Sequence, residues 1–314
     1  MGTDTPERFR SGYVALLGAP NVGKSTLLNQ ILKEKISITC SKPQTTRNRI
    51  VGIFNGPGCQ IVFVDTPGIH RARDTFNRIL VDTALSTLED VDVICFMIEA
   101  SEKPKEMDLF VLEQIQSVNT PIFLVINKID LLKNKAPLLP LMDFYSNQYN
   151  FRAIVPISAL LGDGVNKLLD EITSVLPEGP QYFPHDYLTD LPERFIVAEF
   201  IREKIFHLTK QEVPYSVAVT IEAFREKPEK NLIEIEATIH VERKSQKGII
   251  IGKNGSMLKE IGRLARQDIE RFLGCRVFLS LYVRVQEKWR QDLRVLSEFG
   301  FKPPKTDRKK GKKK

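Results

Sequence analysis

The sequence predicts an α/β domain with a mostly parallel sheet, followed by a smaller α+β domain. Three observations carry this prediction. From residue 13 to about residue 176, short apolar runs alternate with segments of helical length, which is typical of a parallel sheet. The segment 177–184 then holds three prolines and a glycine, which end any helix. Beyond it, a helical period gives way to stretches that alternate with period two.

The elements of the first domain follow from its apolar runs and their breaks. A tight-turn sequence at 55–58 makes the second and third strands an antiparallel pair, whereas helices separate the later strands. We expect strands over 13–18, 48–54, 59–65, 91–98, 121–127 and 151–157. We expect helices over 24–32, 78–88, 105–117, 137–148 and 165–175.

The second domain has the order α-β-β-α-α-β, which is a small sheet with helices on one face. We expect a helix over 192–208, strands over 215–224 and 232–241, a helix that ends at the break 252–255, a helix over 256–273, a strand over 276–285 and a final helix over 285–299. The chain therefore divides into a first domain (1–180), a linker (181–190), a second domain (191–300) and a tail (301–314).

Composition excludes several classes of protein. The chain is 42% hydrophobic and 27% charged, and its longest apolar runs are too short to span a bilayer. The polar start does not resemble a signal peptide, and the four cysteines are scattered, so we expect reduced thiols in the cytoplasm. The tail holds eight basic residues against one acidic residue, which equals the whole net charge of +7. Such a tail reinforces binding to a phosphate backbone or only solubilises the chain.

The segment Gly18–Ser25 has the pattern G-x-x-x-x-G-K-S between an expected strand and an expected helix. Its backbone N–H groups converge on a β-phosphate, Lys24 reaches the β- and γ-phosphates, and the Ser25 hydroxyl is a ligand for Mg²⁺. This loop therefore predicts a site for a nucleoside triphosphate. The residues expected to contact it are Gly18, Ala19, Pro20, Asn21, Val22, Gly23, Lys24, Ser25 and Thr26.

Two further segments complete the expected phosphate site. The motif D-T-P-G ends the strand 59–65, so that Asp65 holds Mg²⁺ through water and Gly68 lies near the γ-phosphate, with Thr66 and Pro67 between them. A threonine in the segment 41–47 can close over Mg²⁺ and the γ-phosphate, which makes this segment an order–disorder switch. We choose Thr46 over Thr45 for that role, and we assign Ser25, Thr46 and Asp65 to the metal.

The base is selected by the motif N-K-I-D, which follows an apolar strand. The Asp130 carboxylate accepts from N1–H and the exocyclic amine of guanine, donors that adenine does not present there. Asn127 ties this loop to the phosphate loop, and the Lys128 stem packs along the purine. The segment Ser158–Leu160, with Ala159 in its middle, ends the next strand, where the Ala159 N–H meets guanine O6. The expected ligands are thus GTP and GDP.

These motifs, in this order and spacing over residues 10–300, resemble those of the bacterial Era GTPases. The resemblance implies a Ras-like P-loop GTPase domain followed by a type II KH domain. It also implies a role in assembly of the small ribosomal (30S) subunit, with the 3′ end of small-subunit ribosomal RNA as ligand. The expected chemistry is hydrolysis of GTP by a positioned water, with Lys24, Thr46 and Asn21 as catalytic candidates.

One departure from Ras-type GTPases concerns hydrolysis. Ile69 occupies the position where those enzymes carry a glutamine that orients the attacking water. Similar GTPases with a hydrophobic residue there turn over slowly or use another element. In some of them the phosphate-loop asparagine, here Asn21, helps to coordinate K⁺, and we extend that role to Asn21 as a hypothesis.

The break Gly252–Gly255 matches the G-x-x-G loop of KH domains, which clamps the backbone of about four nucleotides. The residues expected to contact RNA are Lys247, Gly248, Ile251, Gly252, Lys253, Asn254 and Gly255. For the neighbouring lysines the alternative is a solvated helix face, and for at least two of Ile249–Ile251 it is the helix core. Trp289 could stack on a base, but packing in the core or between domains is the favoured interpretation.

Two alternatives stay open. The chain could be an RNA chaperone that hydrolyses GTP slowly or not at all, since Ile69 cannot orient water. It could also contact anionic lipid through its basic tail, as an accessory peripheral association with the cytoplasmic face of the cell membrane. We otherwise expect a cytoplasmic monomer.

Overall fold

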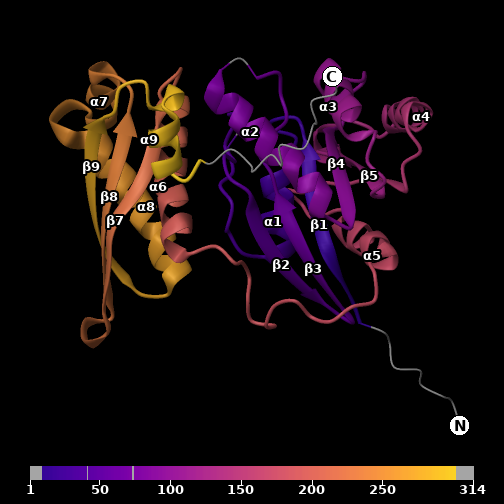
Figure 1. Ribbon diagram of the computed structural model, residues 1–314, viewed down its shortest axis with the longest axis horizontal. Coiled ribbons are helices and arrows are strands. Elements are labelled where there is room, and N and C mark those ends of the chain that lie inside the picture. The colour runs from indigo at the N-terminus through magenta and orange to yellow at the C-terminus, as the bar shows by residue number, and fades with distance from the viewer. Residues whose placement is uncertain (1–8, 41, 73, 302–314) are drawn as a thin grey trace, which may run out of the picture.

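The computed structural model describes residues 9–40, 42–72 and 74–301, arranged as two bodies that lie side by side (Figure 1). The first contains a six-stranded sheet of order β2-β3-β1-β4-β5-β6, and the second a three-stranded sheet of order β7-β8-β9. The basic tail and Ser41, the first residue of the expected switch segment, lie outside the described residues, apart from Phe301 at the start of the tail.

The first body has the expected α/β architecture. Its strands are β1 (Arg10–Gly18), β2 (Ile50–Gly56), β3 (Cys59–Asp65), β4 (Val93–Glu99), β5 (Ile122–Asn127) and β6 (Ala153–Pro156). Its helices are α1 (Lys24–Leu32), α2 (Thr75–Ser86), α3 (Glu106–Ile115), α4 (Leu138–Gln148) and α5 (Val165–Val175). All eleven predicted elements are confirmed, with shifts at their ends. The β2–β3 pair is antiparallel, as the turn at 55–58 predicted, and the other pairs of this sheet are parallel.

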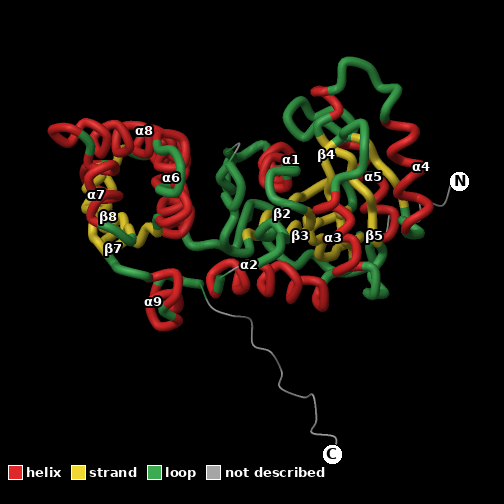
Figure 2. The backbone as a smooth tube through the Cα atoms, turned by 90° about the horizontal axis from the view of Figure 1, so that it is seen from above, coloured by secondary structure: helices red, strands yellow, loops and turns green. Residues whose placement is uncertain are grey.

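Helices lie on both sides of this sheet (Figure 2), which explains why its central strands are apolar runs without alternation. Every residue of β3 and β5 is buried. Because β1, β3, β4 and β5 run parallel, their carboxyl ends lie along one edge of the sheet. The phosphate loop, Asp65, Glu99 and Asn127 follow or end these strands, so they meet at that edge.

The second body follows the predicted order α-β-β-α-α-β. Its elements are α6 (Glu193–Leu208), β7 (Ala218–Lys227), β8 (Leu232–Val241), α7 (Lys244–Ile251), α8 (Ser256–Leu273) and β9 (Arg276–Val285), with a short α9 (Leu293–Glu298). The β7–β8 pair is antiparallel and the β8–β9 pair is parallel. Figure 2 shows α6 and α8 on one face of this sheet, and Ile250 of α7 packs in the core that these helices form with it.

The predicted final helix over 285–299 is wrong. Strand β9 extends through Val285, Lys288 adopts a left-handed backbone with φ 53°, and Trp289–Gln291 form a single 3₁₀ turn. Only α9 is helical, and it begins where the Asp292 side chain accepts hydrogen bonds from the N–H groups of Arg294 and Val295. The apolar residues of this segment therefore face the neighbouring body instead of forming one long helical stripe.

The chain between the bodies packs along the open edge of the first sheet. The Ile53 N–H of β2 donates to the Leu188 carbonyl at 2.8 Å, and the Thr189 hydroxyl donates to the Val51 carbonyl at 2.6 Å. The buried Gln60 side chain bonds the backbone of Tyr182 and Phe183. The linker is thus hydrogen-bonded to β2 and β3 over most of its length, and it covers an edge that would otherwise be unpaired.

An aromatic cluster joins the two bodies. Phe76, Ile79 and Leu80 of α2 pack against Trp289, Val295, Leu296 and Phe301 from the end of the chain. Trp289 is fully buried and donates its indole N–H to the Ser216 carbonyl at 2.9 Å. This confirms the interpretation of Trp289 as a packing residue.

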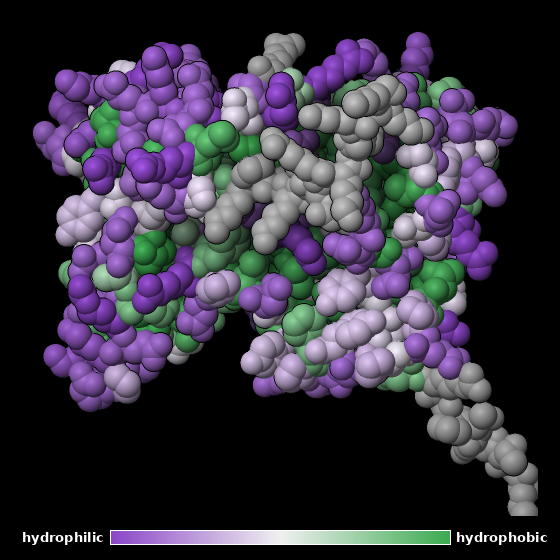
Figure 3. Space-filling model, viewed as in Figure 1, coloured by the Kyte–Doolittle hydropathy of each residue, from purple (hydrophilic) through white to green (hydrophobic). Residues whose placement is uncertain are grey.

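On the face shown in Figure 3 apolar residues form small patches among hydrophilic ones. Within the described residues no helix is long and apolar enough to cross a membrane.

The Phe76→Ala substitution should lower the free energy of unfolding by about 3–5 kcal/mol, because it opens a cavity against Trp289 and Phe301. Trp289 is the only tryptophan of the chain, so its fluorescence should shift to the red in the same variant. Urea unfolding followed by circular dichroism measures the first effect. Phe278→Ala is the matched control, since Phe278 is 60% exposed. Equal stability of the two variants would contradict the packing of Phe76 between the two bodies.

Candidate functional site

The phosphate loop lies between β1 and α1 and is held in an unusual backbone conformation. Gly23 has φ 102°, and a Cβ atom there would lie 2.2 Å from the Asn127 amide nitrogen, so that only glycine fits. Lys24 is buried, and its Nζ donates to the carbonyls of Gly18 at 3.2 Å and Ala19 at 3.0 Å. Burial lowers the pKa of Lys24 to about 8, although Asp65 and Asp108 raise it. The ammonium is therefore poorly solvated, which favours its pairing with an anion.

The three residues predicted to hold Mg²⁺ lie together beneath this loop. The Asp65 Oδ2 accepts hydrogen bonds from the hydroxyls of Ser25 at 2.7 Å and Thr46 at 3.3 Å, and the two hydroxyl oxygens are 2.8 Å apart. The other carboxylate oxygen, Oδ1, is buried and has no partner among the described residues. Burial raises the pKa of this carboxyl, against the lowering effects of Lys24 and of the hydroxyls. Oxygen ligands with an unsatisfied carboxylate oxygen fit Mg²⁺.

Thr46 and Thr45 have different surroundings in the structure. The Thr46 side chain points at Ser25 and Asp65, whereas the Thr45 carbonyl accepts a hydrogen bond from Arg202 of α6. Ser37 is a residue that sequence reasoning missed. It is fully buried and donates its hydroxyl to Asp65 Oδ2 at 3.0 Å. Its only signal in the sequence is its place between two isoleucines, Ile36 and Ile38, which are both buried in the structure.

The segment after Asp65 packs directly on the phosphate loop. The Ile69 N–H donates to the Gly18 carbonyl at 3.1 Å, and the Ile69 side chain is fully buried in the core. The Thr66 hydroxyl bonds the Leu16 carbonyl at 2.8 Å. Ile69 therefore presents no polar group toward the phosphates.

The residues predicted to select the base form a connected set. The Asn127 amide donates to the Val22 carbonyl at 2.7 Å, which ties the base loop to the phosphate loop as predicted. The Ser158 hydroxyl donates to Asp130 Oδ1 at 2.6 Å and orients a carboxylate that is exposed at the surface. Lys128 has a left-handed backbone with φ 67°, and its Nζ lies 3.5 Å from a Glu99 oxygen.

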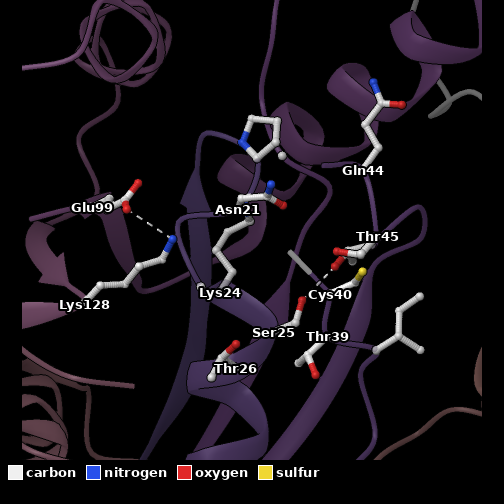
Figure 4. Close-up of a pocket in the computed structure, with 15 residues that line it drawn as sticks. Asn21, Lys24, Ser25, Thr26, Thr39, Cys40, Gln44, Thr45, Glu99 and Lys128 are labelled. Atoms are coloured by element: carbon white, nitrogen blue, oxygen red, sulfur yellow. Dashed lines mark hydrogen bonds and ion pairs between the residues drawn. The ribbon is translucent and has the colours of Figure 1, made fainter. Parts of the chain in front are cut away.

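A cavity of about 520 Å³ lies over these residues and is lined by the phosphate loop, by Thr39–Cys40 and Gln44–Thr46, and by Glu99 and Lys128. In Figure 4, Lys128 and Glu99 lie on one side of the phosphate loop, and Cys40 and Thr45 lie on the other. A second hollow, lined by Ala159, Leu160 and the outer face of α1, shares Thr26 and Thr39 with the cavity. The two hollows together extend from the phosphate loop to the base loop.

The loop Gly252–Gly255 connects α7 and α8. Asn254 and Gly255 have φ 52° and φ 78°, and Lys253 and Asn254 are exposed. A groove of about 530 Å³ leads away from Gly255 between α8 and β9. Its lining combines apolar and basic side chains, namely Leu258, Lys259, Arg263, Arg266, Phe278, Leu279 and Leu281, with Gly262. Such a groove suits unpaired bases with their phosphates on the basic rim.

Comparison with known proteins decides the family. Residues 13–128 match the family model of the 50S ribosome-binding GTPases, and residues 212–290 match that of the KH domain. GTPase Era of Geotalea uraniireducens is 57% identical over 297 residues, which cover 95% of this chain and 99% of that protein. The chain belongs to the Era GTPase family. It is accordingly a GTP-hydrolysing enzyme with a KH domain.

Other Era proteins agree along the whole chain. GTPase Era of Alkaliphilus metalliredigens is 47% identical over 293 residues, covering 93% of this chain and 99% of that protein. A crystal structure of Era with MgGDPNP and nucleotides 1506–1542 of 16S ribosomal RNA superposes with a TM-score of 0.91 at 43% identity, covering 94% of this chain and 99% of that one. A variant of Aquifex aeolicus Era, bound to GDP·AlF₄⁻, gives the same TM-score and identity over 94% of this chain and 100% of that one.

In this Era-family chain the Ala159 N–H donates to the Asn127 side-chain oxygen at 2.9 Å, so it lies beside the residue that joins the base loop to the phosphate loop. Its expected contact with guanine O6 stays a prediction. The expectation for the isoleucines of α7 needs correction. Of Ile249–Ile251 only Ile250 is fully buried, whereas Ile249 is 46% exposed and Ile251 is half-buried. The expectation of two core residues there was wrong because α7 is a short helix with one face on the domain.

The groove between α8 and β9 also contains an aromatic residue that sequence reasoning did not find. Phe278 lies on β9, away from the G-x-x-G loop in sequence. An exposed aromatic in a strand with period-two alternation was its available signal.

The Asp130→Asn substitution should reverse the base preference of the site. Asparagine presents one donor where aspartate presents acceptors, so affinity for GTP should fall about 100-fold or more while xanthosine triphosphate, which carries a carbonyl in place of the amine, gains affinity. Titration with both nucleotides measures this. Asp143→Asn, on the exposed face of α4, is the control. Unchanged GTP selectivity in Asp130→Asn would contradict the assignment.

Proposed function

We propose that the nucleotide state of this GTPase controls the binding of its KH domain to the 3′ end of small-subunit ribosomal RNA, in assembly and maturation of the 30S subunit. The observation that carries the proposal is the position of the described residues 35–40 and 42–47 of the loop 35–47. It contributes Ser37 and Thr46 to the Asp65 cluster, and it also bonds α6 of the KH domain. A change of this loop at the γ-phosphate would therefore also change its contacts with the KH domain.

Contacts between this loop and α6 are numerous. Lys35 pairs with Glu203 at 2.5 Å, and the Thr39 N–H donates to the same carboxylate at 3.1 Å. Lys42 donates to two carbonyls at the end of α6, that of Phe206 and that of Thr209, the residue that follows the helix. The relative solved with MgGDPNP and a 16S ribosomal RNA fragment supports the choice of RNA.

The proposed chemistry is attack of a positioned water on the γ-phosphate, with no covalent intermediate. Lys24 would hold the β- and γ-phosphates, and the backbone of 18–26 and 65–68 would surround them. Ser25, Thr46 and Asp65 would hold Mg²⁺, which supplies positive charge to the phosphate oxygens when bound. Asn127, Lys128, Asp130 and Ser158–Leu160 would hold guanine. RNA would lie on Lys247, Gly248, Ile251 and the loop Gly252–Gly255.

The buried Ile69 favours a second candidate, a GTP-dependent RNA chaperone with little or no turnover. Single-turnover hydrolysis with and without the ribosomal RNA 3′ end separates the two candidates, because acceleration supports the enzyme and absence of turnover supports the chaperone. The monomeric state, the cytoplasmic location and the accessory membrane contact of the tail stay predictions from the sequence.

Reversing the charge of the G-x-x-G loop should weaken RNA binding at least about tenfold, because carboxylates replace groups that face the phosphates. The test variant is Lys253→Asp with Asn254→Asp, measured with an oligonucleotide of the 3′-terminal sequence in the presence of GDPNP. Lys230→Asp with Asn231→Asp is a matched control, since it is also an exposed Lys–Asn pair whose asparagine has positive φ.

Equal RNA affinity of these two double variants would contradict binding of RNA at the G-x-x-G loop. Crosslinking of the GTP form to cellular RNA tests the partner itself. If ends of small-subunit ribosomal RNA are not enriched, the assembly role fails and the GTPase activity is unaffected.

Asn21 is proposed to provide a K⁺ ligand that replaces the missing glutamine. It lines the cavity in a left-handed conformation with φ 66°, next to Lys24. Hydrolysis should be at least about tenfold faster in K⁺ than in Na⁺ at equal ionic strength, and Asn21→Ala should abolish the difference. Asn166→Ala, on the exposed face of α5, should keep it. Equal rates of hydrolysis in K⁺ and Na⁺ would exclude a catalytic role for K⁺ at Asn21.

A further inference from the structure

Arg47 is a buried arginine of the GTPase domain whose side chain is bound by the KH domain. It follows Thr46 directly, and its side chain is 1% exposed. Its Nη1 donates to the Val217 carbonyl at 2.5 Å, and its Nη2 donates to the carbonyls of Pro214 at 3.1 Å and Tyr215 at 3.0 Å. All three acceptors precede β7 in the KH domain, so the guanidinium of a GTPase-domain residue is bound by the other domain.

Aromatic rings from both domains enclose this guanidinium. Its central carbon lies 5.4 Å from the ring centroid of Phe76 in α2 and 5.6 Å from that of Phe206 in α6. Phe76 in turn contacts Trp289 at 5.4 Å between ring centroids. Arg47 therefore lies where α2, which follows the D-T-P-G segment, meets the KH domain. Cation–π contacts add to the hydrogen bonds once water is excluded.

The surroundings of Arg47 make it sensitive to domain docking. Among the described residues no carboxylate forms an ion pair with it, and its Nε has no partner. Burial, and then the neighbouring guanidinium of Arg202, lower the pKa of Arg47 well below its usual value. A buried charge held by neutral carbonyls is stable only while those carbonyls are in place. If the KH domain moves away, Arg47 loses every hydrogen bond that it makes here.

Thr46 is fixed on both sides by the same domain. The Thr45 carbonyl accepts from Arg202, which is itself paired with Glu199 at 2.5 Å within α6. Arg47 anchors the other side. Thr46 is buried between them and reaches Ser25 and Asp65. The residues on both sides of Thr46 are consequently held by the KH domain, while its hydroxyl is held by the GTPase domain.

We propose that Arg47 is the positioning residue through which the KH domain holds Thr46 at the phosphate and metal site. This inference rests on the proposed function and names the residue that links its two halves. Closing of the loop 35–47 over GTP and docking of the KH domain then occur together, and each stabilises the other by the same factor. GDP, which lacks the γ-phosphate, does not use Thr46 and is bound independently of docking.

The test compares Arg47→Gln with Arg49→Gln in the full-length protein. Arg49 lies two residues further on, is exposed, and its side chain forms no hydrogen bond or ion pair with the described residues, so it is a matched control. Affinities for GDP and GDPNP are measured in Mg²⁺. Affinity for an oligonucleotide of the ribosomal RNA 3′ end is then measured in each nucleotide state. Circular dichroism melting and GDP affinity show whether each variant is folded.

Arg47→Gln should weaken GDPNP binding about tenfold relative to GDP and bring the ratio of RNA affinities in the two nucleotide states close to one. Arg47→Lys keeps the charge but fewer hydrogen bonds, so it should restore part of both ratios. A merely structural role would lower stability and leave the ratios unchanged. Ratios in Arg47→Gln that equal those of Arg49→Gln would overturn the inference. If the unsubstituted protein shows no nucleotide dependence of RNA affinity, the proposed function fails instead.

Discussion

The arrangement of the nucleotide site depends on one buried carboxylate. Asp65 ends a strand that is buried throughout, so its charge has no access to bulk water and must be stabilised by groups that the chain brings to it. Ser25 comes from the phosphate loop, and Ser37 and Thr46 come from the loop that crosses toward the KH domain. Hydrogen bonds to a single oxygen atom of Asp65 therefore hold the phosphate loop and the loop 35–47 in place. It also leaves the second oxygen available for a cation.

Much of the fold and of the nucleotide site could be predicted from the sequence because the relevant signals are local. Phosphate-binding backbone requires glycine at fixed spacing, and a parallel sheet buried on both faces requires unbroken apolar runs. Asn127 could be assigned to the phosphate loop for the same reason, since motif order fixes which strand ends are neighbours. Ser37 could not be assigned, because its function depends on the path of a loop without regular structure.

The parts of the structure that sequence reasoning missed involve contacts between the domains. The apolar residues of 285–299 have a helical spacing, but tertiary packing on α2 favours a turn and a short helix. Arg47 appears in sequence as one of several basic residues in a polar loop, and nothing local predicts that three carbonyls of another domain enclose it. Long-range docking selects these conformations, and a single sequence carries little information about it.

The linker along β2 has a consequence for how the two domains can be separated. Because Ile53, Val51 and Gln60 bond it, the linker acts as an additional strand-like segment of the GTPase sheet and not as a free tether. A GTPase fragment that ends at residue 180 would expose a hydrogen-bonding edge beside Val51, Ile53 and Val62, whose apolar cluster Phe183 covers. Such an edge is a template for self-association. The smallest soluble GTPase unit of this chain should therefore end after Thr189.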